Sequence, residues 1–227
     1  MDSAAPPPHS SRPPIPARLH DAPTAQGLAI PFLTLRHRSP GSPVWGAIDP
    51  ERYALILALR LCQVCGEKLG HGHGPGQQVV VLVRPQDWVG GIGPEAGLHP
   101  ECAAYSTRGC PMLAGRMPAY RSTAIAARIT PCGDPECACP QWIQPSPESE
   151  EATRAGKPAD AWYSILLDAR DYRIVPFQHT ESGPATYGVD LRGLRIRRLR
   201  RVRVTPGAAP TILDQLAAIL DLSRLTS

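Results

Sequence analysis

The chain has 227 residues with 27 prolines and 20 glycines, a composition that favours loops and predicts two small cores rather than one large core. Its 24 basic and 20 acidic residues leave a formal charge of only +4, which is too small to indicate nucleic acid by itself. No stretch reaches the roughly 18 apolar residues of a membrane span, and the first residues lack a secretory signal. We therefore expect a cytoplasmic protein with no membrane partner.

The N-terminal part of the chain changes character near residue 28. Residues 1–27 are mainly proline, serine and alanine, and they predict a disordered tail because they bury too little apolar surface to offset the entropy lost on ordering. Order is expected to begin near Ile30. A helix is predicted over 49–61, because Asp49 is a good N-cap and Pro50 suits the first helical position.

Two cysteines separated by two residues follow this helix. The spacing of Cys62 and Cys65 lets a tight turn direct both sulfurs at one metal ion, and Gly66 allows the chain to turn back. The next segment, 77–83, is short and rich in β-branched residues, so it predicts a strand.

A second pair with the same spacing, His99 and Cys102, lies at the start of a helix predicted over 100–107. Together with Cys62 and Cys65, this pair completes a tetrahedral Cys3His set that is typical of structural zinc. Because all four positions are filled by the protein, no position remains for an activated water. The sequence therefore predicts a structural zinc ion here.

The order of ligand pair, hairpin and helix over 61–107 resembles the treble-clef zinc-finger group, with matches at Cys62, Cys65, Gly66, His99 and Cys102. Treble clefs serve binding, catalysis and scaffolding, so this resemblance implies zinc and a fold but no single function. The wider pattern of RLCQVCG, LHPECAAYSTRGCPML and PCGDPECACPQW resembles small proteins of actinobacteria and their phages. That second resemblance spans 31–142 and implies zinc and location, but no established activity.

A third group of cysteines predicts a second zinc site that lacks one ligand. Its members are Cys132, Cys137 and Cys139. Cys110 is the most economical fourth ligand, because it is the only cysteine left. The alternatives are His71, His73 and His179. If water filled the fourth position instead, this would be the favoured catalytic site.

The polar, acidic segment 145–160 predicts a linker between a zinc-binding domain over 28–144 and a second unit over 161–227. The second unit should contain several short strands, at 162–167, 172–177, 186–189 and 194–204. An amphipathic helix is expected over 211–225. The predicted fold class is α+β, with a treble-clef-like zinc domain followed by a small antiparallel β-sheet unit and a C-terminal helix.

The segment 191–204 is rich in arginine and contains no acidic residue. In a strand, one face of this segment could neutralise several phosphates, so it is the candidate nucleic-acid contact. Its basic residues are Arg192, Arg195, Arg197, Arg198, Arg200, Arg201 and Arg203. The opposing interpretation is a solvated face or one paired with the acidic linker, and no aromatic side chain interleaves the arginines to stack on bases.

No HExxH, Walker or GxSxG motif occurs, so the sequence indicates a binding protein rather than an enzyme. The leading prediction is a zinc-stabilised adaptor that contacts nucleic acid or a nucleic-acid-associated protein through the arginine-rich segment. A regulatory or phage-related protein–protein module is the first alternative. A metal-dependent enzyme with an open second zinc site is the second. No small-molecule substrate is indicated.

Overall fold

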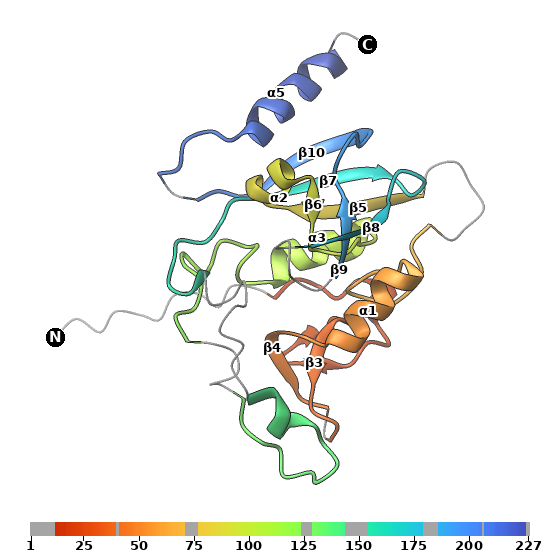
Figure 1. The fold of residues 1–227 in the computed structure, drawn as a ribbon, viewed down its shortest axis with the longest axis vertical. Helices are drawn as coiled ribbons and strands as arrows, with labels where there is room; N and C mark the ends of the chain where they lie inside the picture. Colours follow the sequence, from red (N-terminus) through yellow and green to blue (C-terminus); the bar gives the residue numbers. More distant parts are fainter. Residues whose placement is uncertain are drawn as a thin grey trace, which may run out of the picture.

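The computed structural model describes residues 12–39, 41–70, 77–123, 129–143, 154–178, 186–205 and 207–225. The fold is mixed α/β, with small antiparallel sheets and a helix at the C-terminal end (Figure 1), which confirms the predicted mixture of elements. Within these ranges, none of the helices has the length and apolar character needed to cross a membrane.

The central sheet has three antiparallel strands in the order β10–β7–β5. Their bounds are Gln78–Val83 for β5, Trp162–Asp168 for β7 and Ile196–Arg203 for β10. The register places Val83 opposite Tyr163 and Leu199 opposite Ile165. Strand β5 is buried on both faces, as its nearly continuous run of valine and leucine predicts.

This sheet joins segments that the sequence analysis assigned to two units. Strand β5 belongs to the predicted domain over 28–144, whereas β7 and β10 belong to the predicted unit over 161–227. One hydrophobic cluster extends from Leu19 to Leu213. The segment 145–160 therefore does not separate two cores, because the backbone groups of β5 find their partners on β7. Residues 144–153 lie outside the described residues.

The predicted tail over 1–27 also differs from the structure where it is described. Residues 1–11 lie outside the described residues, but Leu19 at the end of the short 3-10 helix η1 (Ala17–Leu19) is only 1% exposed. The two-residue strands β1 (Thr24–Ala25) and β2 (Leu28–Ala29) then pair with each other. This segment is ordered because Leu19 packs into the main hydrophobic cluster.

A second three-stranded sheet has the order β6–β9–β8 and again joins distant segments. Strand β6 (Ile92–Gly93) follows the short helix α2 (Pro85–Gly90) and pairs with β9. The other strands are β8 (Ile174–Phe177) and β9 (Thr186–Asp190). The last described element is helix α5 (Ile212–Leu225), which contacts β10 and α2.

Helix α1 (Pro50–Leu59) begins as predicted and ends two residues earlier than predicted. The Asp49 carboxylate accepts hydrogen bonds from the backbone N–H groups of Glu51 and Arg52, and Arg60 ends the helix in a left-handed conformation with φ 54°. Before it, β3 (Thr34–Arg36) and β4 (Pro43–Ile48) form an antiparallel pair. This end of α1 places Cys62 at the start of a turn.

Gly97 lies where two packed segments approach closely, between β6 and helix α3 (Pro100–Gly109). A Cβ atom at this position would lie 2.7 Å from Val79 Cγ1 and 2.8 Å from Leu69 Cδ1. We expect Gly97→Ala to lower the free energy of unfolding by about 1–3 kcal/mol through overpacking. Urea denaturation would measure this, with Gly90→Ala as the control, because open space surrounds Gly90. Equal stability of the two variants would contradict the expectation.

Candidate metal centres

The structure brings together all four residues of the first predicted zinc site. The sulfur atoms of Cys62, Cys65 and Cys102 and a ring nitrogen of His99 all lie within 4.8 Å of one another. Cys65 Sγ lies 3.3 Å from His99 Nδ1. Cys62 and Cys102 are fully buried, whereas the other two residues are partly exposed.

Backbone bonds shape the turn that carries the first ligand pair. The Gly66 N–H donates to the Cys62 carbonyl at 2.9 Å, and Gly66 has φ 77°, a conformation that favours glycine. A second bond, from the Gln63 N–H to the Gly97 carbonyl at 3.2 Å, joins this turn to the segment that leads into α3. His99 is the N-cap of α3 and Cys102 lies in its first turn, so the helix directs both side chains towards the cysteine turn.

The ligand residues influence one another's protonation. Burial raises the pKa of the Cys62 thiol, but hydrogen bonds from the neighbouring ligands outweigh burial and hold that pKa well below its ordinary value. Hydrogen bonds with Cys62 and Cys65 raise the pKa of His99 to about 10. The group thus stabilises a thiolate beside a protonated imidazole. A bound metal cation would take the place of the imidazolium proton as the partner of the thiolate.

Arg18 links the two segments that carry the ligands of this first centre. Its guanidinium forms ion pairs with Glu67, next to the cysteine turn, and with Glu101 of α3, where Nε lies 2.5 Å from the carboxylate oxygen. These side chains are partly exposed, so each pair contributes only a modest amount to stability. Arg18 was not among the predicted site residues, because it lies in the segment predicted to be disordered.

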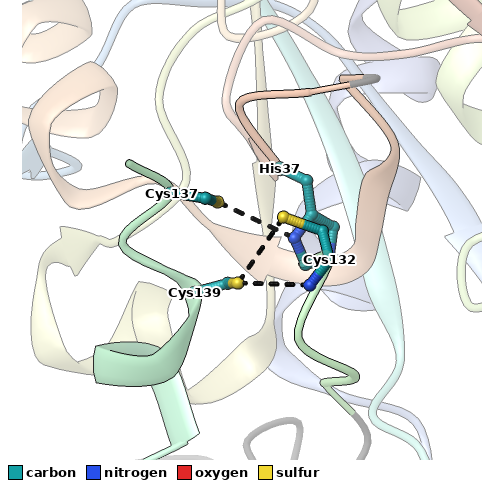
Figure 2. Close-up of side chains that lie close together, drawn as sticks. All are labelled: His37, Cys132, Cys137 and Cys139. Carbon is teal, nitrogen blue, oxygen red and sulfur yellow. Dashed lines mark hydrogen bonds between the residues drawn. The ribbon is translucent and has the colours of Figure 1, made fainter. Parts of the chain in front are cut away.

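A second group of potential ligands consists of His37, Cys132, Cys137 and Cys139 (Figure 2). One ligand atom from each residue lies within 4.8 Å of the others. Cys132 Sγ is 3.8 Å from Cys139 Sγ, and Cys137 Sγ is 3.9 Å from His37 Nδ1. His37 follows β3 in the turn before β4, and Cys139 begins the 3-10 helix η3 (Cys139–Ile143).

The fourth member of this second group is therefore His37 and not Cys110, which was the economical choice from the sequence. Cys110 is the C-cap residue of α3, where its side chain packs against the main hydrophobic cluster. It does not join the cysteines near residue 132. The alternatives His71, His73 and His179 lie outside the described residues.

The surroundings of the second group favour the thiolate form of Cys137. The Arg38 N–H donates to Cys137 Sγ at 3.5 Å, and this bond is the main reason that the pKa of Cys137 falls to about 6. The Arg38 guanidinium pairs with Asp134 at 3.2 Å and with Glu136 at 2.5 Å. The His37 ring also lies 5.4 Å from the Trp142 ring, centroid to centroid. These contacts hold the cysteine segment against the β3–β4 turn.

Each group therefore could hold a metal ion, and the donor atoms of both fit the same chemistry. Three thiols and one imidazole form a soft, tetrahedral donor set of the kind that zinc takes in closed sites. The first group joins residues 62–65 to 99–102, whereas the second joins residue 37 to 132–139. A metal in the second group would link segments almost 100 residues apart.

Most of the arginines in the predicted nucleic-acid contact are engaged within the protein. Four pair with aspartates at the following distances: Arg192 with Asp190 at 2.7 Å, Arg195 with Asp171 at 3.3 Å, Arg197 with Asp168 at 2.7 Å and Arg201 with Asp214 at 2.9 Å. Arg203 is only 4% exposed and donates to the carbonyls of Met112 and Met117. Arg198 and Arg200 are exposed. The predicted contact therefore has much less uncompensated charge than its sequence suggests.

The described acidic partners of these arginines come from the sheets, the turns between strands and helix α5, and not from the acidic linker proposed as their partner in the alternative interpretation. Asp168 ends β7, and Asp171 lies in the turn between β7 and β8.

Comparisons of the chain with protein-family models, with curated proteins and with solved structures found no match.

Proposed function

We propose that this protein is a non-enzymatic binding protein stabilised by two structural zinc ions, one in each Cys3His group. The observation that carries the proposal is that the second group, like the first, contains four protein ligands with donor atoms within 4.8 Å of one another. Structural zinc sites have four protein ligands, whereas catalytic zinc sites keep one position for water or substrate. A metal-dependent enzyme with an open second site is therefore less favoured.

The surroundings of the first group support a treble-clef-like module. A turn with two ligands precedes β5, and α3 begins at the second ligand pair. An antiparallel bridge between Val80 and Leu98, with two backbone bonds of 2.9 Å, connects β5 to the residue before His99. This bridge would serve as the hairpin of the module, although β5 forms most of its ladder with β7.

The second zinc would act as a cross-link rather than as part of the main core. It would fasten the segment 132–142 to the β3–β4 turn, where ion pairs of Arg38 and a contact between the His37 and Trp142 rings hold it among the described residues. A short segment with little apolar burial needs such a link to become ordered.

A protein–protein module is the second candidate function. It is favoured by Ile212 and Ile219 on α5, which are 49% and 61% exposed.

The metal content of the purified protein tests the proposal. We expect two zinc ions per chain, and X-ray absorption should give an average shell of three sulfurs near 2.3 Å and one nitrogen near 2.0–2.1 Å, roughly the distances of closed sites. A zinc with an oxygen ligand at one site would favour the enzyme. A protein that folds fully with less than one zinc per chain would contradict the proposal.

A further inference from the structure

A hollow of about 510 Å³ lies between the N-terminal segment, the end of α3 and β10. Its basic lining residues are Arg12, Arg108 and Arg116, and its apolar ones include Pro13, Leu113 and Val202. No acidic residue lines it. These three arginines were not among the predicted site residues, because they are dispersed over more than 100 residues and only the fold brings them together.

Two of the arginines of this hollow, Arg108 and Arg116, are held by carbonyl groups instead of carboxylates. The Arg108 Nε donates to the Ala104 carbonyl at 3.1 Å, and Arg116 donates to the carbonyls of Arg108 and Gly109 at 3.0 and 2.9 Å. Within the described part of the chain, none of the three forms an ion pair with an acidic side chain. A carbonyl orients a guanidinium without cancelling its charge, so all three charges remain available to an anion.

Two arginines of β10 extend the same basic surface. The register of β10 on β7 places Arg198 opposite Leu166, Arg200 opposite Ser164 and Arg203 opposite Trp162. These three residues of β7 alternate along the strand, so the three arginines lie on one face of the sheet. Arg203 on this face donates to the Met112 carbonyl, next to Leu113 in the wall of the hollow. Arg198 and Arg200 are both exposed, and neither pairs with a described carboxylate.

We propose that this surface binds single-stranded nucleic acid through the phosphate backbone. The five contacting residues are Arg12, Arg108, Arg116, Arg198 and Arg200, which we call the basic groove. The proposal rests on the proposed function, because it names the partner of the zinc-stabilised binding protein. It also replaces most of the residues that the sequence predicted as the contact.

The mixture of charge and apolar surface favours a nucleic acid over an acidic peptide. Guanidinium groups match phosphate oxygens with two donors at once, and a single strand offers one phosphate per nucleotide. The prolines and aliphatic side chains between the arginines can cover the face of an unpaired base or a sugar. An acidic peptide has neither of these groups. The volume of the hollow is in the range of sites that enclose a small-molecule-sized group.

Fluorescence anisotropy with a labelled 20-nucleotide oligo-dT probe tests this proposal. Five phosphate contacts predict an affinity that falls roughly 100-fold between 50 and 200 mM salt. The double variant Arg108→Gln/Arg200→Gln should lower the affinity at least about tenfold at low salt and reduce the slope of log K against log salt by about 1.4.

The matched control is Arg195→Gln/Arg197→Gln, which removes the same charge from arginines that pair with Asp171 and Asp168. We expect this control to bind within about twofold of the wild-type protein, because the removed charges are already compensated. Equal losses in both double variants would overturn the basic groove, as would tight binding of a polyglutamate peptide without binding of oligo-dT. Zinc content measured on the same samples keeps the two proposals separate, since oligo-dT binding by a zinc-free protein would contradict only the proposed function.

Discussion

The Cys62→Ser variant is expected to lose the first zinc ion and to be largely unfolded at 25 °C. Cys62 is fully buried, and its N–H donates to the Glu67 carbonyl at 2.8 Å within the turn that carries the first ligand pair. Structural zinc contributes about 10–16 kcal/mol of apparent folding free energy in small zinc-dependent units, which is as large as the whole stability of a typical domain, about 5–15 kcal/mol. Zinc content and circular dichroism during heating would measure both losses.

Cys110→Ser is the matched control for this variant. It makes the same chemical change at a partly buried cysteine that belongs to neither ligand group. We expect it to retain two zinc ions and a cooperative unfolding transition, with a loss of stability in the range of about 0.5–3 kcal/mol that is usual for single substitutions. If Cys62→Ser and Cys110→Ser had the same metal content and melting temperature, the first centre would not stabilise the fold.

The His37→Ala variant is expected to bind one zinc ion instead of two and to keep the main sheet folded. The hydrophobic cluster around β5, β7 and β10 includes no described residue of 129–143, so the loss of the second centre should release that segment locally. Limited proteolysis should then cut within 129–143, while circular dichroism changes little. Metal analysis would give the zinc content directly.

His20→Ala provides the control for this second variant, because His20 is exposed and lies outside both ligand groups. It should retain two zinc ions and the protease resistance of the wild-type protein. Two zinc ions in His37→Ala would show that another residue completes the second site. Global unfolding of His37→Ala would instead mean that the second centre supports the main core.

Local signals in the sequence predicted several elements well. The N-cap at Asp49, followed by proline, indicates the start of α1, and the β-branched run before Val83 indicates β5. The paired spacing of Cys62 with Cys65 and of His99 with Cys102 also suffices to select the four residues that the structure brings together. In each case the physical cause acts over a few neighbouring residues, so the pattern can be recognised in the amino-acid sequence.

Long-range contacts explain what the sequence did not reveal. His37 precedes Cys132 by 95 residues, and a single histidine in a turn has no spacing that marks it as a ligand. Similarly, the aspartates that neutralise the arginine-rich segment lie on other strands and turns, for example Asp168 at the end of β7. Leu19 is buried within a proline-rich segment because a neighbouring core accommodates it, not because its own segment is apolar.

The pairing of β5 with β7 has a consequence for synthesis of the protein on the ribosome. Val83 and its partner Tyr163 are 80 residues apart, so translation at about 5–20 residues per second leaves β5 without its partner for about 4–16 s. During that interval the exposed run of valines and leucine is the type of segment that aggregates with other chains. Closure of the first ligand group needs only residues up to 102, so zinc capture by the nascent chain would bring Leu98 against Val80 and cover part of β5 before β7 emerges.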